Sequence, residues 1–262
     1  MLRTEGLTKR FGGIVATDNV DFELESDELC SLIGPNGAGK TTFFNLLTGA
    51  LEPTEGTIEF NGEDITDAVP EETASLGIHR SFQITNIFPT STVLENVRIA
   101  AQAKSSKSLH LWRNFAAYDE FQEEAHEILE RVGLDDRADE YAQSLSHGEK
   151  RKLEVGIALA GDPDVLLLDE PNAGVSSESV GEIIDLIEDV SEDHAVLLVE
   201  HNMDIVMTVS DRIVVLNQGS VIADGPPEEI QDDPKVQEAY LGGYEEGQLE
   251  TDPETTSEEG LV

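Results

Sequence analysis

The sequence predicts an α/β fold built on a mostly parallel β-sheet with helices on both faces. Two features support this prediction. The apolar segment ELCSLIG, at 28–34, runs into a glycine-rich turn and then into a helix-like segment, KTTFFNLLTG. From about residue 165 onward, short apolar strands alternate with helical segments. Such alternation is typical of parallel sheets, in which a helix usually connects one strand to the next.

Strands are expected at 15–33. Apolar and β-branched positions alternate at 15–33, and Gly49 is placed to end the helix that follows the glycine-rich turn. Turns at Gly56 and at Asn61-Gly62 bracket a short strand at 57–60. This pattern predicts a small antiparallel β region packed beside the main sheet.

A helical insertion follows. Apolar residues recur at three- and four-residue spacing within 93–141, which predicts a helical subdomain at about 90–160.

The tail at 245–262 has no basic residue and little apolar content, which predicts disorder. We therefore expect one folded domain at 1–244. Beyond the insertion, its strands are expected at 165–168, 195–199, 213–216 and 220–223, with helices from Glu178 and Met203.

The net charge of the chain limits the classes of partner that it can bind. The 262 residues include 55 Asp and Glu but only 16 Lys and Arg, a formal net charge of −39. A protein this acidic has no general electrostatic attraction for nucleic-acid phosphates, so no nucleic-acid partner is expected. Acidic residues spread so evenly, with so few lysines, predict a halophilic protein from a high-salt cytoplasm, where screening removes the self-repulsion.

Cysteine content and hydropathy indicate the compartment. Cys30 is the only cysteine, which excludes an internal disulfide and is compatible with a reducing cytoplasm. The start of the chain, MLRTEGLTKRF, lacks the apolar core of a secretory signal. Apolar runs such as 165–168 and 195–199 are far shorter than the roughly 20 residues that span a bilayer. We expect a soluble protein whose membrane role, if any, depends on a partner.

The glycine-rich turn GPNGAGKT, at 34–41, has the spacing of a phosphate-binding loop. Glycines leave backbone N–H groups free to surround phosphate oxygens, and the next helix presents its positive end. We expect Lys40 to reach the β- and γ-phosphates and the Thr41 hydroxyl to bind Mg²⁺. A chance glycine turn is the alternative, which the position between strand and helix disfavours. The residues expected to contact ATP here are Gly34, Pro35, Asn36, Gly37, Ala38, Gly39, Lys40, Thr41 and Thr42.

Two further strands end in polar residues. VLLLDEP ends with Asp169 and Glu170, and VLLVEHNM ends with His201. Ligands of such folds bind at the carboxyl edge of the sheet. Asp169 is a candidate Mg²⁺ ligand, direct or through water, and Glu170 a candidate general base for an attacking water. The acids could instead cap the next helix or be solvated, and His201 could be structural rather than a charge stabiliser near a γ-phosphate.

Over about 2–242, these motifs together resemble the nucleotide-binding subunit of ABC transporters, a P-loop NTPase-type fold. The resemblance implies that Gln83, in RSFQ, contacts Mg²⁺ and the attacking water, and that His201 is the switch histidine. It also implies that Phe11, in TKRFGG, stacks on adenine. Taken as a bare sequence feature, Phe11 is instead expected to be a core phenylalanine.

The segment LSHGE aligns with the LSGGQ signature of that family, which contacts the γ-phosphate held by the other subunit of a head-to-tail dimer. It comprises Leu145, Ser146, His147, Gly148 and Glu149. The residues alone predict a helix that starts near Glu149, capped by Ser146 in a capping box that needs no ligand. The same helix N-terminus offers free N–H groups to an anion. Both interpretations can hold at once.

Two positions depart from the family pattern. His147 replaces a signature glycine, so an imidazole stands where a bare backbone is often needed. Ser176, in NAGVSSES, stands where the family usually has aspartate. Communication across the dimer is therefore either weaker or supplied by a non-identical partner subunit.

Within the family, RFGGIVATDNVDFEL, the helical insertion and the C-terminal region resemble branched-chain amino-acid importer subunits. SLSHGEK is also similar to the related urea importers, and a lipopolysaccharide-exporter ATPase is a more distant relative. The resemblance implies permease subunits docked near 83–98, a second ATP-binding subunit, an extracellular solute-binding protein and a location on the cytoplasmic face of the membrane. One alternative is a soluble ABC-type ATPase without a transporter. Another is a non-catalytic nucleotide sensor, and the intact Lys40, Asp169 and Glu170 disfavour this second alternative.

Overall fold

A computed structural model describes residues 1–81, 87–104 and 114–245. A six-stranded sheet lies at its centre, in the order β10-β9-β3-β8-β7-β6. Neighbouring strands are parallel except for β10, which runs antiparallel to β9. The expectation of a mostly parallel sheet is confirmed. Its strands are β3 (Leu29–Ile33), β6 (Ile78–Ser81), β7 (Val165–Asp169), β8 (Ala195–Val199), β9 (Arg212–Asn217) and β10 (Ser220–Gly225).

The expected antiparallel region is a second sheet of four strands in the order β2-β1-β4-β5. The strand expected at 57–60 is part of it and begins two residues earlier, at Glu55. The N-terminal strand was not predicted from the sequence. The members of this sheet are β1 (Leu2–Phe11), β2 (Ile14–Leu24), β4 (Glu55–Phe60) and β5 (Glu63–Asp64).

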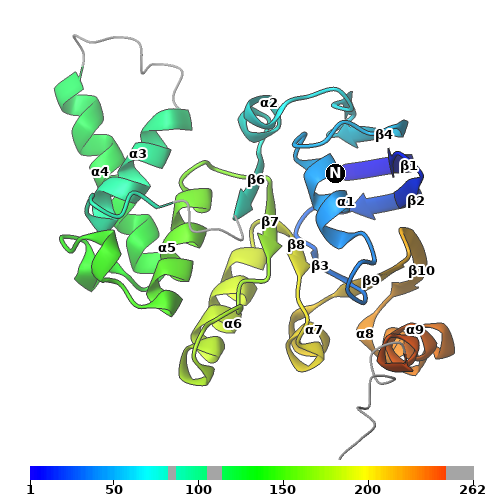
Figure 1. The fold of residues 1–262 in the computed structure, drawn as a ribbon. Coiled ribbons are helices and arrows are strands. Elements are labelled where there is room, and N and C mark those ends of the chain that lie inside the picture. The colour runs from blue at the N-terminus through cyan, green and yellow to red at the C-terminus, as the bar shows by residue number, and fades with distance from the viewer. Residues whose placement is uncertain (82–86, 105–113, 246–262) are drawn as a thin grey trace, which may run out of the picture.

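Helices cover both faces of the main sheet (Figure 1). In this view α1 and the antiparallel sheet lie above it, α6 and α7 lie below it, and α3, α4 and α5 gather beyond its β6 edge. Helices α8 and α9 pack near β10 at the opposite edge. The helices are α1 (Lys40–Leu47), α2 (Pro70–Ser75), α3 (Val93–Lys104), α4 (Asn114–Arg131), α5 (His147–Leu159), α6 (Ser177–Ser191), α7 (Met203–Val209), α8 (Pro227–Asp232) and α9 (Pro234–Glu245), with 3-10 turns η2 (Asp135–Arg137) and η3 (Ala142–Ser144).

Strand β7 shows how the core is divided between the two faces. All five of its residues are buried. Leu166 and Leu168 pack into the cluster that includes α3 to α6, whereas Val165 and Leu167 pack with Phe43 of α1 and with the antiparallel sheet. Alternate side chains of a strand point to opposite faces. A continuous apolar run in the sequence is therefore what a strand covered on both sides requires.

The acidic tail lies beyond Glu245, outside the described residues, and its disorder stays a prediction together with the domain limits. No helix in the described ranges is both long and apolar enough to cross a bilayer.

Candidate nucleotide site

The carboxyl ends of three parallel strands meet at one edge of the main sheet. Leu32 of β3 and Asp169 of β7 both lie beside Val199 of β8 in the strand register. The residues that follow these strands are therefore brought together. They are the glycine-rich loop after β3, Glu170 after β7, and Glu200 and His201 after β8.

The glycine-rich loop has a backbone that other residues could not adopt. Gly34 and Gly39 have φ values of 150° and 106°. A Cβ atom at Gly34 would lie 2.1 Å from the Leu216 carbonyl oxygen, and one at Gly39 would lie 2.3 Å from that of Ala16. Helix α1 begins directly after the loop, at Lys40. This is the geometry in which loop N–H groups and a helix N-terminus bind phosphate.

Lys40 lies inside the loop. Its Nζ donates to the carbonyl oxygens of Gly34 (2.6 Å) and Pro35 (3.2 Å), and only 8% of the residue is exposed. Burial lowers the pKa of this ammonium, while the negative charges of Glu170 and Asp169 act to raise it. The loop lysine and both candidate acids therefore belong to one electrostatic site.

Asp169 is buried and paired. Its carboxylate accepts a 2.6 Å hydrogen bond from the Arg80 guanidinium, and the two side chains are 4% and 11% exposed. Arg80 also donates to Asn45 Oδ1, at 2.6 Å, and its guanidinium lies over the Phe44 ring, 5.5 Å from the centroid. The sequence analysis did not identify Arg80, whose partners lie far from it along the chain.

Glu170 and His201 form a pair at the mouth of the site. His201 Nε2 lies 2.7 Å from Glu170 Oε1, with side-chain exposures of 48% and 24%. Glu170 has φ = 48°, a left-handed conformation that costs a non-glycine residue about 1–2 kcal/mol. Its N–H donates to the Val199 carbonyl at 2.8 Å. The carboxylate is therefore fixed by backbone and side chain together, and it remains accessible to a ligand.

Glu200 holds the segments after β7 and β8 together. Its Oε1 accepts from the backbone and side-chain nitrogens of Asn172, both at 3.1 Å, and its Oε2 accepts from the His201 N–H at 3.1 Å. It is 6% exposed. Sequence reasoning missed this residue, although an acid at the end of the apolar run in LLVEH was a signal that could have found it.

The predicted capping box is confirmed. Ser146 Oγ accepts from the Glu149 N–H at 3.3 Å, and Glu149 Oε2 accepts from the Ser146 N–H at 2.8 Å. The helix begins at His147, slightly before the expected start near Glu149. Burial acts to raise the pKa of Glu149, but the hydrogen bonds with Ser146 and the charge of Arg137 outweigh it and lower the pKa.

The two departures from the family pattern lie near each other. A Cβ atom at Gly174 would lie 3.0 Å from His147 Nε2, so the exposed imidazole sits against the loop after β7. Ser176 is the N-cap residue of α6, and its hydroxyl donates to Ser179 Oγ at 3.3 Å.

The predictions for Phe11 and Gln83 have different outcomes. The expectation that Phe11 is a core residue is wrong, because 46% of it is exposed at the end of β1. The Lys9 ammonium lies 5.4 Å from its ring centroid. An exposed aromatic ring is free to stack on a base. Gln83 lies outside the described residues, so its predicted role is untested.

The described residues contain no cluster of three or more His, Cys, Asp or Glu side chains able to hold a metal ion by themselves. The residues at the strand edge nevertheless suit Mg²⁺, which typically takes one or two protein oxygens and completes its shell with phosphate and water. Thr41, exposed in the first turn of α1, and Asp169 offer such oxygens.

The phosphate loop, the acids that follow β7 and the capped start of α5 lie on a fold that this chain shares with a solved ATP-binding cassette. The profile described as "ABC transporter" matches residues 17–173. The chain belongs to the ABC transporter family of ATP-binding proteins, and it is an ATPase. Within that family, a profile described as "Branched-chain amino acid ATP-binding cassette transporter" matches residues 220–246.

Curated relatives and solved structures extend the match to most of the chain. The branched-chain amino acid transport ATP-binding protein LivG of Salmonella typhimurium is 42% identical and covers 92% of this chain and 98% of its own. A probable LivG of Archaeoglobus fulgidus is 39% identical, covering 94% and 96%. A solved ATP-binding cassette of an ABC transporter superposes with a TM-score of 0.81 at 35% identity, covering 92% and 98%.

Proposed function

We propose that this ATPase drives the uptake of branched-chain amino acids through a membrane permease. The observation that carries the proposal is the meeting of Lys40, Asp169 and Glu170 at one sheet edge, in a chain whose curated relatives are named as branched-chain amino acid transport proteins. An ATP-binding subunit contacts the permease rather than the cargo. The choice of cargo therefore rests on the relatives.

ATP is positioned by the loop at 34–42. Its N–H groups and the Lys40 ammonium hold the phosphates, and the exposed ring of Phe11 stacks on adenine. Mg²⁺, bound by Thr41, Asp169 and Gln83, would neutralise charge that develops on the phosphates. Arg80 fixes one carboxylate oxygen of Asp169, which leaves the other for the metal or its water.

Glu170 is the proposed general base. Its carboxylate accepts a proton from the attacking water, and its hydrogen bond to His201 Nε2 holds it in place before ATP arrives. Once ATP is bound, His201 can turn its donor toward the γ-phosphate oxygens and stabilise their charge. The pairing of Glu170 with His201 fits these two consecutive roles.

The site is proposed to be completed by a second ATP-binding subunit. Ser146 and Gly148, at the start of α5, offer a hydroxyl and a free N–H to the γ-phosphate held by that partner. A solved cassette described as dimeric and bound to ADP and Pi superposes with a TM-score of 0.74 at 26% identity. A partner that differs from this chain would also account for Ser176.

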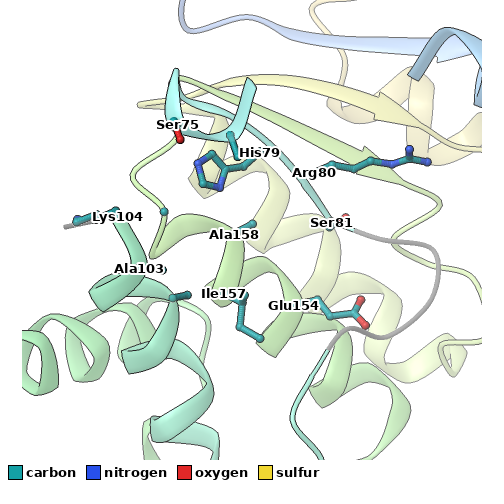
Figure 2. Close-up of a pocket in the computed structure, with 12 residues that line it drawn as sticks. Ser75, His79, Arg80, Ser81, Ala103, Lys104, Glu154, Ile157 and Ala158 are labelled. Carbon is teal, nitrogen blue, oxygen red and sulfur yellow. The ribbon is translucent and has the colours of Figure 1, made fainter. Parts of the chain in front are cut away.

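The permease is proposed to dock in a groove between α2, β6, α3 and α5, shown in Figure 2. The groove has a volume of about 400 Å³ and is lined by Ala100, Ala103 and Ile157, among others. Three polar atoms of its lining residues are buried and find no hydrogen-bond partner among the described residues: His79 Nε2, Arg80 Nε and Ser81 Oγ. The apolar part of this lining is the surface that a docking segment would cover.

The mechanism is tested by Glu170→Gln. The variant keeps the shape of the side chain but cannot accept the proton, so it should bind MgATP and lose roughly 100-fold or more of its hydrolysis rate. We expect it to accumulate as an ATP-dependent dimer in size-exclusion chromatography. Undiminished hydrolysis would remove Glu170 from the role of base.

A urea importer subunit and a soluble ATPase are the competing functions. The SLSHGEK segment favours the first of these. Membrane fractionation addresses the second, because a transporter subunit should sediment with membranes that contain its permease. Recovery of the chain solely in the soluble fraction would favour an ATPase without a transporter.

A further inference from the structure

Arg151 is a buried cation in helix α5, five residues beyond the cap of that helix. Its side chain is 9% exposed, and its Nη1 donates to Glu154 Oε2 at 2.6 Å. Two further hydrogen bonds of the guanidinium go to backbone carbonyls. Nε donates to the Pro171 carbonyl at 3.2 Å, and Nη2 donates to the Asp169 carbonyl.

These two carbonyls belong to the residues on either side of Glu170. One guanidinium therefore holds the backbone immediately before and immediately after the proposed base. Glu170 itself has φ = 48°, a conformation that persists in a non-glycine residue only when its surroundings enforce it. Arg151 supplies part of that enforcement from a different element.

We infer that Arg151 is a positioning residue for Glu170, an inference that rests on the proposed role of Glu170 as the base. The planar fork of arginine can reach several acceptors at fixed angles, whereas the ammonium of lysine is a compact point charge on a flexible stem. The fork fixes the peptide geometry that aims the Glu170 carboxylate at His201 and the attacking water.

The position of Arg151 in α5 gives the contact a second consequence. The same helix begins with Ser146 and Gly148, which are proposed to meet the ATP held by the partner subunit. A shift of α5 on engaging that ATP would move the guanidinium, and with it the peptides beside Glu170. Arg151 therefore lies in the same helix as Ser146 and Gly148 and bonds the backbone on both sides of Glu170.

The competing explanation is a purely structural one, in which Arg151 only neutralises buried Glu154. Under that explanation, loss of the guanidinium lowers stability, and any effect on hydrolysis is independent of Glu170. Under the positioning role, the effect on hydrolysis passes through Glu170. The two explanations are separated by combining substitutions at both positions.

The first test compares Arg151→Met and Arg151→Lys with Lys152→Met, a control on the same helix whose residue pairs with Glu182 at 2.6 Å. Both Arg151 variants should lower kcat about 10- to 100-fold, because a small misplacement of a catalytic group has that effect. The Kd for MgATP should stay within about twofold, since none of the described contacts of Arg151 is with the phosphate loop. Wild-type kcat in Arg151→Lys would overturn the inference, as would a loss in Lys152→Met equal to that in Arg151→Met.

The second test adds each Arg151 substitution to Glu170→Gln and follows single-turnover hydrolysis over hours. We expect no further loss, because the group that Arg151 positions is already disabled. A loss that multiplies in the double variant would overturn the inference and leave Glu170 as the base. Undiminished hydrolysis by Glu170→Gln alone would instead overturn the proposed function. If Arg151→Met does not fold, Arg151→Lys decides both tests.

Discussion

At the residue scale, burial constrains the protonation state of His79. Burial lowers its pKa below the ordinary value of 6.5, although a hydrogen bond to the Ala74 carbonyl and the charge of Asp162 act in the opposite direction. The fold disfavours the charged form of this imidazole, whereas the unfolded chain takes up a proton below about pH 6.5. Stability is therefore full above that pH and falls as the solution becomes more acidic.

We predict that His79→Asn flattens this dependence. The Tm of the wild type should drop between about pH 7.5 and about pH 5.5, and the drop should be smaller in the variant, which has no titratable side chain at position 79. Differential scanning calorimetry at several pH values measures the difference. His126→Asn is a suitable control, since His126 is exposed and pairs with Asp135. Equal drops in wild type and His79→Asn would contradict the assignment.

The sequence predicted the site residues that act through local patterns. A few neighbouring residues are enough to recognise the glycine spacing, the acids at the end of 165–171 and the Ser146 cap. Arg80, Arg151 and Glu200 were missed, because the contacts that connect them to the site join residues 18 to 89 positions apart. Phe11 shows the converse: its apolar character suggested burial, and only the fold shows that it is exposed.

At the element scale, the start of α5 serves two purposes. Ser146 caps the helix through the reciprocal bonds with Glu149, and the same hydroxyl is proposed to meet a phosphate in the partner subunit. The stability effect can be measured without nucleotide, which separates it from the functional one.

We predict that Ser146→Ala lowers the free energy of unfolding by about 0.5–1 kcal/mol, the usual cost of losing a serine cap. Urea denaturation of the nucleotide-free protein measures this change. Ser191→Ala is the matched control, because that hydroxyl donates to the Glu188 carbonyl at the end of α6 and caps no N-terminus. An effect no larger than that of the control would show that the cap contributes nothing to stability.

Strands β1 and β6 explain why the sequence under-predicted the β-structure. The alternation of β1 is broken by register shifts around Gly6, and its buried face includes Thr4 and Thr8. Strand β6 pairs only with β7 at the edge of the sheet and carries polar His79 and Arg80. Neither strand shows the apolar run that made β7 and β8 predictable.

At the scale of the whole molecule, the net charge of −39 is the dominant feature. Mutual repulsion among so many carboxylates opposes the compact state, and salt weakens that repulsion. The Debye length falls from about 10 Å at 0.1 M salt to about 3 Å at 1 M. We propose on this basis that the protein is adapted to a salt-rich cytoplasm.

The prediction is that Tm rises steadily as KCl increases from about 0.1 M to about 2 M, because the carboxylates become screened. Sorbitol at matched osmolality is the control, since it supplies no ions. Maximal stability already reached in dilute buffer would contradict the adaptation to salt.

If the chain is the ATPase of an amino-acid importer, transport of the amino acid is the most direct measurement of its function. Uptake of labelled leucine and labelled urea would be measured in native cells that carry either the wild type or Glu170→Gln, at matched expression. We predict a selective loss of leucine uptake, because the variant binds ATP but cannot complete the cycle. Selective loss of urea uptake, or no change in either, would contradict the assignment to branched-chain amino acids.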